Sequence, residues 1–250
     1  MKKLIKTVTI LLILPELSLF ASEIAPINSK IKEQMIKGNT YKSSCPVKIE
    51  DLRYLKIPYY GFDNKTHMGE MIVHKSVANE VAAIFKSLKE AKYPIYQMKL
   101  ASYYKGSDDE SMRHNNTSAF NCRLMTGSRT KWSKHSYGKA IDINPIQNPY
   151  VKGKKVLPKE GAKYIGLNRS HLSSQADDRA IIISGDKIIR YFKKYGWIWG
   201  GSWHSLKDYQ HFEKKFKASY KAEKPKTANK KASPKKLFDG LNNGEVDGAF

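Results

Sequence analysis

Two short segments of the chain contain residue types suited to metal catalysis. Residues 133–142 read Ser-Lys-His-Ser-Tyr-Gly-Lys-Ala-Ile-Asp and contain His135 and Asp142, while a later segment contains Asp208 and His211. A catalytic zinc ion takes three ligands from the protein and keeps one position open for water. A nearby carboxylate must move the proton of that water, and a positive group must stabilise the charged carbonyl oxygen. These segments offer both ligands and a base.

The residues between His135 and Asp142 indicate how the two side chains meet. Gly138 allows the backbone to turn after the histidine. Residues 139–144 alternate between apolar and polar side chains, which predicts a strand whose Ala140 and Asp142 share one face. The small Ala140 leaves room for a metal ion on that face.

Asp208 and His211 are three residues apart, so one turn of chain can bring both to the same site. One of them can bind the metal while the other acts as the base. The spacing alone does not assign the two roles.

Together the two segments resemble the motifs of a zinc peptidase family that includes D-alanyl-D-alanine carboxypeptidases, D-Ala-D-Ala dipeptidases and L-alanyl-D-glutamate endopeptidases. The first segment matches Ser-x-His-x-x-Gly-x-Ala-x-Asp, and the second has Trp-Gly-Gly-x-Trp followed by an acid, two residues and His-Phe. Residues 116–123 are similar to a segment upstream of the signature in the endopeptidase-like branch. The resemblance covers residues 45–213.

The resemblance implies that His135, Asp142 and His211 bind zinc and that Asp208 is the general base. Other branches of the family have Glu at the base position, so Asp208 points to the endopeptidase-like branch.

Two further roles are implied, each with a simpler alternative. Arg123 occupies the place of an arginine that steadies the developing oxyanion or a substrate carboxylate; the alternative is a surface arginine held in a salt bridge. Ser133 would form a hydrogen bond near the ligands. The alternative is a serine that only closes a turn.

The resemblance also implies an α+β fold, Hedgehog/DD-peptidase-like, with a small antiparallel sheet, helices on one side and zinc in a surface cleft. The local pattern agrees, since strands and helices do not alternate as a parallel α/β fold requires. The expected elements are strands and turns over 45–75, a helix over 77–91, a strand over 95–102, a polar loop over 104–118, a strand over 139–144, a long loop over 145–178 and a helix over 186–195.

Both ends of the chain differ in composition from its middle. Residues 1–22 have a basic start, a short apolar run and small residues, which is typical of a secretory signal peptide; the alternative is an N-terminal membrane anchor. Residues 23–44 are a polar leader, and the peptidase domain follows over 45–213. Residues 214–250 form a tail in which 214–236 hold ten lysines and one acid. We therefore expect an exported protein of the periplasm or cell envelope, with no membrane span after signal cleavage.

The net charge of +22 predicts an anionic partner. Export disfavours nucleic acid and favours peptidoglycan stem peptides, which carry free carboxylates. The lysine-rich tail either binds an anionic envelope polymer or does nothing specific. In an oxidising compartment Cys45 and Cys122 either form a disulfide or stay free thiols.

The predicted function is that of a zinc metallopeptidase which hydrolyses a peptide bond in the stem peptide of peptidoglycan, as an endopeptidase or a D,D-carboxypeptidase. The first alternative is a non-catalytic cell-wall-binding protein on the same fold. The second is a basic adhesion or nucleic-acid-binding protein that acts through the lysine-rich tail.

Overall fold

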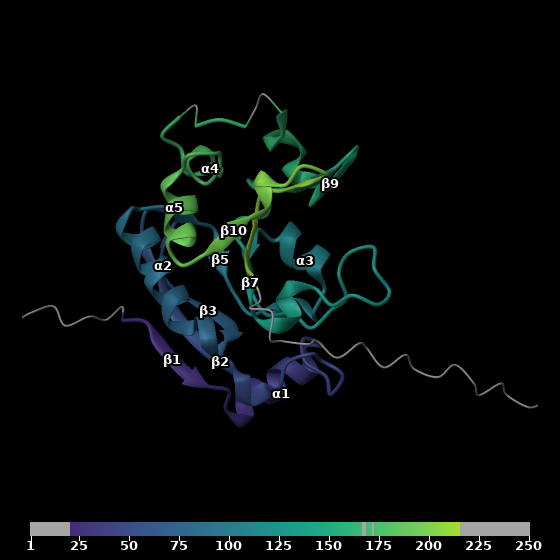
Figure 1. Cartoon of the computed structure of the whole chain (residues 1–250). Helices are drawn as coiled ribbons and strands as arrows, with labels where there is room; N and C mark the ends of the chain where they lie inside the picture. The colour runs from purple at the N-terminus through teal and green to yellow at the C-terminus, as the bar shows by residue number, and fades with distance from the viewer. Residues whose placement is uncertain (1–20, 167–168, 172, 216–250) are drawn as a thin grey trace, which may run out of the picture.

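The structure of the protein is a computed structural model that describes residues 21–166, 169–171 and 173–215 (Figure 1). The helices are α1 (Ser29–Lys37), α2 (Ala78–Glu90), α3 (Asp108–Arg113), α4 (Ala176–Arg179) and α5 (Lys187–Lys194). The strands are β1 (Glu23–Pro26), β2 (Leu52–Gly61), β3 (Thr66–His74), β4 (Pro94–Ile95), β5 (Gln97–Met98), β6 (Asn116–Thr117), β7 (Ala140–Asp142), β8 (Tyr150–Lys152), β9 (Lys155–Leu157), β10 (Trp197–Trp199), β11 (Lys207–Asp208) and β12 (His211–Lys214).

The strands form several small sheets. In the first, β1, β2 and β3 are antiparallel and β4 pairs in parallel with β2. The second has the antiparallel order β10-β12-β7, and the third has the order β11-β8-β9. The short β5 and β6 pair in parallel. Small antiparallel sheets with separate helices agree with the expected α+β class, although the strands are divided among several sheets instead of one.

The first sheet is buried on both faces because its strands carry apolar residues at odd and even positions. On β2, Leu55 and Ile57 point into the main core, which also takes in the apolar face of α2. Leu52 and Tyr54 point into a second core that includes residues of α1. Helices therefore cover both faces of this sheet, which differs from the expectation of helices on one side.

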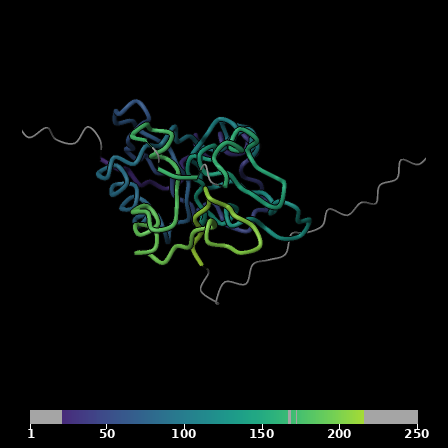
Figure 2. Tube along the Cα trace, turned by 90° about the horizontal axis from the view of Figure 1, so that it is seen from above, coloured from purple at the N-terminus to yellow at the C-terminus, as the bar shows by residue number. Residues whose placement is uncertain are grey.

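The helix predicted over 77–91 is confirmed as α2, and that predicted over 186–195 is confirmed as α5. Apolar side chains recur on one face of α2 at Val81, Ile84 and Leu88, and all three are buried. The same core contains apolar residues of α5 and of the second sheet. In Figures 1 and 2 the green-to-yellow C-terminal segments accordingly pack against the purple-to-blue N-terminal layer.

Residues 23–44, which we expected to precede the domain as a polar leader, pack against it. Strand β1 pairs with β2, and Asn28 caps α1 by accepting a hydrogen bond from the backbone N–H of Ile31. Ile31 and Met35 lie four residues apart, so both fall on one face of α1 and enter the second core. Two apolar residues at this spacing are enough to dock an otherwise polar helix.

Three local predictions also need correction. The expected loop over 104–118 contains α3 and β6, because Ser107 caps a helix whose Ser111 and Met112 are buried. The expected strand over 95–102 is broken into β4, β5 and a 3-10 turn. The expected loop over 145–178 contains the hairpin of β8 and β9.

Some predictions lie outside the described residues. They concern most of the signal peptide over 1–22 and most of the tail over 214–250, and both stay predictions. Within the part of the chain that the structure describes, no helix is both long and apolar enough to cross a membrane.

The two cysteines, whose state the sequence left open, form a disulfide between Cys45 and Cys122 with an S–S distance of 2.00 Å. The bond joins the segment after α1 to the segment before Arg123, and it borders the second core. A covalent link across 77 residues of sequence reduces the conformational freedom of the unfolded chain.

We expect the double substitution Cys45→Ser and Cys122→Ser to lower the free energy of unfolding by about 2–5 kcal/mol. Urea denaturation of the oxidised wild type and of the double variant measures the difference. Reduction of the wild type should give a similar loss. Equal denaturation midpoints for all three samples would contradict a stabilising disulfide.

Candidate metal centre

Two adjacent strands place Asp142 and His211 side by side. Strands β7 and β12 are antiparallel, and their register sets these two residues directly opposite each other. Opposed residues of paired strands project from the same face of a sheet, within reach of one another. His211 Nδ1 lies 2.9 Å from Asp142 Oδ1. The pair thus follows from strand register.

His135 reaches the same point from a tight 3-10 turn over Lys134–Tyr137. Ser133 caps this turn by accepting a hydrogen bond from the backbone N–H of His135 at 3.3 Å. Gly138 ends the turn with φ of 62°, and a Cβ there would lie 2.5 Å from the backbone nitrogen of His74. The glycine of the motif is therefore required both by its conformation and by its close neighbour.

A backbone carbonyl fixes the orientation of the His135 ring. Nδ1 donates to the Ala119 carbonyl oxygen at 2.6 Å, so the proton of a neutral ring is on Nδ1. Nε2 then faces the cluster, 3.1 Å from Asp142 Oδ2 and 3.3 Å from His211 Nδ1. Metal-binding histidines commonly donate their other ring nitrogen in this way.

The three side chains form a buried group of potential metal ligands. One ligand atom from each of His135, Asp142 and His211 can be chosen so that all lie within 4.8 Å of one another. Two imidazole nitrogens and one carboxylate oxygen are a suitable donor set for zinc. The opposite face of β7 and β12 belongs to the core, so Asp142 and His211 are held on a rigid support.

The charges of the group stabilise one another in the metal-free protein. Burial disfavours the ionised form of Asp142, but the charges and hydrogen bonds of His135 and His211 outweigh it and hold the pKa of Asp142 well below its usual range. For His211, burial disfavours the charged ring, yet hydrogen bonds to Asp142 and Glu213 raise its pKa to about 10. A metal ion at this site competes with the proton on His211.

A cleft in the surface is lined by His135, Asp142 and His211. Asp208 of β11 lines the same cleft. Its Oδ1 is buried without a hydrogen-bond partner. Burial, assisted by the charge of Asp142, raises the pKa of Asp208 to about 7, although His211, His135 and a hydrogen bond from Gln210 act in the opposite direction. A carboxyl group that titrates near neutrality is suited to acid–base catalysis.

Close packing requires a glycine at position 200 of the second motif. A Cβ at this position would lie 2.7 Å from the Asp208 carbonyl oxygen and 3.3 Å from the Cβ of His211. The turn over Gly200–Ser202 thus packs directly against the backbone that carries the candidate base. At Gly201 a Cβ would clash with the Trp199 ring at 2.2 Å, so both glycines allow close packing.

Arg123 lines the cleft and is held in an ion pair, while its role toward an oxyanion or a substrate carboxylate stays a prediction. Its Nη2 lies 2.7 Å from Asp108 Oδ2, and its Nε is buried without a partner. The buried Ser136 fixes its backbone, accepting from the Arg123 N–H at 2.9 Å and donating to the Arg123 carbonyl oxygen at 2.6 Å. The turn that carries His135 thereby also positions Arg123.

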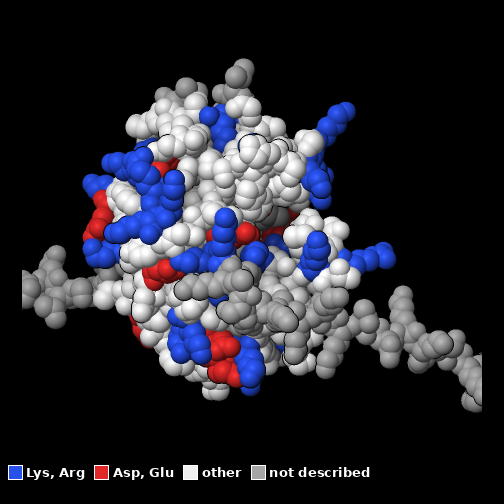
Figure 3. All heavy atoms as spheres, viewed as in Figure 1, with Lys and Arg blue, Asp and Glu red and all other residues white. Residues whose placement is uncertain are grey.

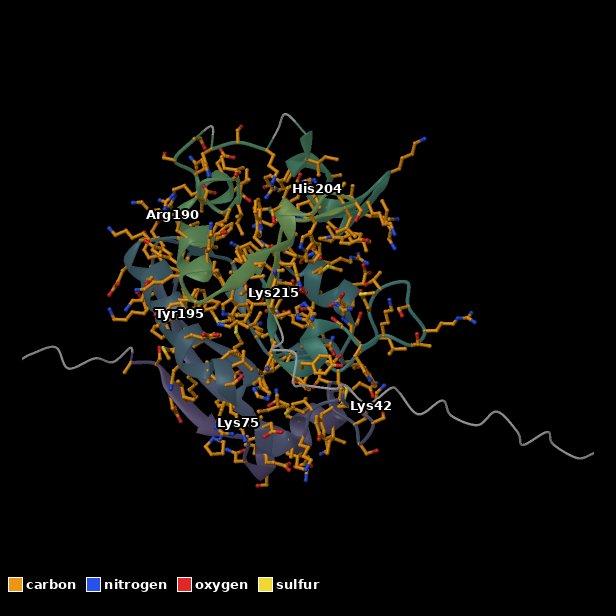
Figure 4. The ribbon with its side chains drawn as sticks, in the orientation of Figure 1. Lys42, Lys75, Arg190, Tyr195, His204 and Lys215 are labelled. Carbon is orange, nitrogen blue, oxygen red and sulfur yellow. A yellow bond between two sulfur atoms is a disulfide. The ribbon has the colours of Figure 1, made fainter. Side chains whose placement is uncertain are left out.

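Several residues of the cleft escaped the sequence-based prediction. Glu213 Oε2 lies 3.2 Å from His211 Nε2, and its place two residues after His211 on one strand face was the available signal. Trp203, by contrast, belongs to the second motif, and its ring lies 5.5 Å from the His211 ring. Asp108 gave no signal, because the loop over 104–118 has no pattern that points to Arg123. His204, labelled in Figure 4, is exposed and does not belong to the cluster.

The cleft is lined by both signs of charge. Arg123, Lys134 and Lys152 border it together with the acidic Asp108, Asp142, Asp208 and Glu213. Over the whole face seen in Figure 3, lysine and arginine side chains are spread widely, with acidic groups among them.

A comparison with known families covers the part of the chain that carries the cluster. Residues 126–214 match the model of a family described as D-alanyl-D-alanine carboxypeptidase. That match supports the suspected family over these residues. It spans His135, Asp142, Asp208 and His211, whereas Arg123 lies just before it. No curated protein and no solved structure matches the chain.

We expect the purified protein to bind about one zinc ion per chain, because a catalytic zinc site needs three ligands from the protein. His211→Ala removes one ligand and should lower the zinc content to near zero. The affinity should fall at lower pH, since a proton competes for the same histidine.

Metal analysis after dialysis, with calorimetry at two pH values, measures both effects. The matched control is His204→Ala, which removes an exposed histidine outside the cluster. Equal zinc loss in the two variants would contradict the assignment of the site.

Proposed function

We propose that this protein is a zinc metallopeptidase that hydrolyses a peptide bond in the stem peptide of bacterial peptidoglycan. The observation that carries the proposal is a buried His135, Asp142 and His211 group beside Asp208, whose Oδ1 has no hydrogen-bond partner, in the same cleft. The family match supports peptidase chemistry of this kind. We also propose that the fold is Hedgehog/DD-peptidase-like, with zinc in a surface cleft.

In this proposal His135, Asp142 and His211 hold zinc. When bound, zinc supplies Lewis acidity that lowers the pKa of water and polarises a peptide carbonyl. Ser133 maintains the turn that aims His135, and Glu213 orients His211 through Nε2. Buried side chains with fixed partners need little rearrangement when the metal binds.

Asp208 performs the proton transfers. Its carboxylate accepts a proton from the attacking water and then donates one to the leaving amine. A pKa near 7 suits both steps, since the group can be deprotonated before the first and can readily lose the proton in the second. Oδ1 has no hydrogen bond within the protein that would compete with this exchange.

Arg123 stabilises negative charge on the substrate. Its guanidinium faces the cleft and is held by Asp108, which fixes its direction. The charge can lie against the developing oxyanion or against a substrate carboxylate. Lys152 on β8 adds positive charge to the cleft, which favours binding of stem peptides that carry carboxylates.

We also propose that the protein is exported to the periplasm or cell envelope. A signal peptide over 1–22 would deliver the chain to the periplasm or cell envelope, where its substrate lies. The disulfide between Cys45 and Cys122 supports export, because such bonds persist in oxidising compartments. An anionic envelope polymer is the proposed partner of the lysine-rich tail.

We expect the mature protein to release new peptide fragments from purified peptidoglycan, and Asp208→Ala to reduce the rate about 10²–10⁴-fold by removing the general base. Mass spectrometry of the digest detects the fragments, and their masses identify the bond as an endopeptidase or a D,D-carboxypeptidase site.

Chelation should abolish the activity, and added zinc should restore it. Asp109→Ala, which removes an aspartate that does not line the cleft, is the matched control. Peptidoglycan binding without any fragment, even with added zinc, would favour the non-catalytic wall-binding alternative.

The pH dependence of kcat/KM should show an acid limb from Asp208. Only the carboxylate form can accept a proton, so the rate should fall as the pH drops through the pKa of Asp208. That pKa is about 7 in the metal-free protein, and the positive charge of zinc moves it lower. Rates measured in zinc-saturated buffers from pH 5 to 9 test this, and a rate still rising steeply above pH 8 would contradict it.

A further inference from the structure

The cleft contains an unusual concentration of buried polar atoms without a partner. Among the described residues, buried side-chain atoms with no hydrogen bond are found at Arg123, Arg169, Asp208 and Gln210. All but Arg169 line the cleft beside the candidate metal centre. An unpaired buried polar atom costs free energy, so such atoms call for an explanation. Their concentration here points to groups that a bound ligand satisfies.

Gln210 is the member that the proposed mechanism uses neither as a ligand nor as a base, although its side chain forms a hydrogen bond with Asp208. It lies between Asp208 and His211 at the junction of β11 and β12, and only 2% of its surface is exposed. Its Nε2 donates to the Met112 sulfur of α3 at 3.5 Å. The sulfur has no proton to donate, so this contact directs the amide nitrogen toward α3. The amide oxygen, Oε1, is left without a donor.

The unpaired atoms at Gln210 and Arg123 are of the two kinds that a peptide backbone can satisfy. Gln210 Oε1 is an acceptor, and Arg123 Nε is a donor. A peptide chain presents both N–H groups and carbonyl oxygens, so it offers partners for atoms of each kind. The cleft has a volume of about 240 Å³, which leaves space for part of a peptide chain beside the metal centre.

We infer that Gln210 is a specificity-determining residue whose side-chain oxygen accepts a hydrogen bond from a backbone N–H of the bound peptide. This inference rests on the proposed peptidase function and adds a substrate contact to it. The contact favours secondary amides over esters or N-alkylated amides at one position next to the scissile bond. It also helps to exclude ligands that have no N–H at that position.

A series of stem-peptide analogues tests the contact, each with one non-scissile amide replaced by an ester. The replacement removes one N–H and keeps the chain length. We expect one analogue to lose about five- to tenfold in kcat/KM with the wild type, the usual effect of one neutral hydrogen bond. Gln210→Met has a similar shape and no oxygen, so it should process that analogue and the parent peptide at nearly equal rates.

Two controls separate this contact from general damage. Gln147→Met makes the same chemical change at another buried glutamine, whose amide is paired with Asn115 and Asp177 away from the cleft. It should lower thermal stability and retain the wild-type preference for the amide. Zinc content and the thermal midpoint of Gln210→Met show whether that variant is folded and loaded.

If Gln210→Met becomes inactive, binding is measured instead by calorimetry in an Asp208→Asn background. The parent peptide and the ester analogue should then differ in affinity only when Gln210 is present. An unchanged preference in either measurement would overturn the role of Gln210 and leave the peptidase function intact. A wild type that cleaves none of the parent peptides would overturn the proposed function and this inference together.

Discussion

The candidate site depends on the register between β7 and β12. This pairing sets Asp142 opposite His211, and it also sets Ala140 opposite Glu213. Because side chains alternate along a strand, a shift of one residue would turn His211 into the core and expose Phe212 in the cleft. The candidate ligand pair and the carboxylate that contacts His211 are therefore both consequences of one strand alignment.

The core maintains this alignment from the other face of the same strands. Phe212 is fully buried, and its ring stacks on Phe192 of α5 with a centroid separation of 4.0 Å. Ile141 of β7 is buried in the same cluster. Moving the register would cost the burial of these side chains, which is worth about 1.5–3 kcal/mol for each. Stability and site geometry are thus provided by alternate residues of two short strands.

Burial also sets the chemistry of the cleft. The ionised forms of Asp142 and His211 are stabilised by each other and by hydrogen bonds, whereas burial dominates at Asp208 and raises its pKa to about 7 despite the hydrogen bond from Gln210. Two aspartates in one cleft therefore behave differently because the histidines offset the cost of burial at Asp142 but not at Asp208. The long segment after β7 also packs against the chain beside Asp208. The guanidinium carbon of Arg169 lies 3.7 Å from the centroid of the Tyr209 ring, and Tyr209 follows Asp208 in the sequence.

The sequence by itself determined the residues of the metal group and the elements with strong periodicity. His135, Asp142, Asp208 and His211 were found because the motifs fix residue type and spacing, and α2 and α5 were found from their apolar faces. Local periodicity is enough for the helices. For the site residues the resemblance to family motifs assigned the roles, because spacing alone left them open.

Contacts between distant segments were decided only by the tertiary structure. The partnership of Asp108 with Arg123, the docking of α1 through two apolar residues and the disulfide of Cys45 each join parts of the chain that no local pattern connects. The pKa of Asp208 and the unpaired oxygen of Gln210 likewise depend on burial by the folded chain. Spacing along the chain specifies which groups are present, but their desolvation and their partners are set by long-range packing.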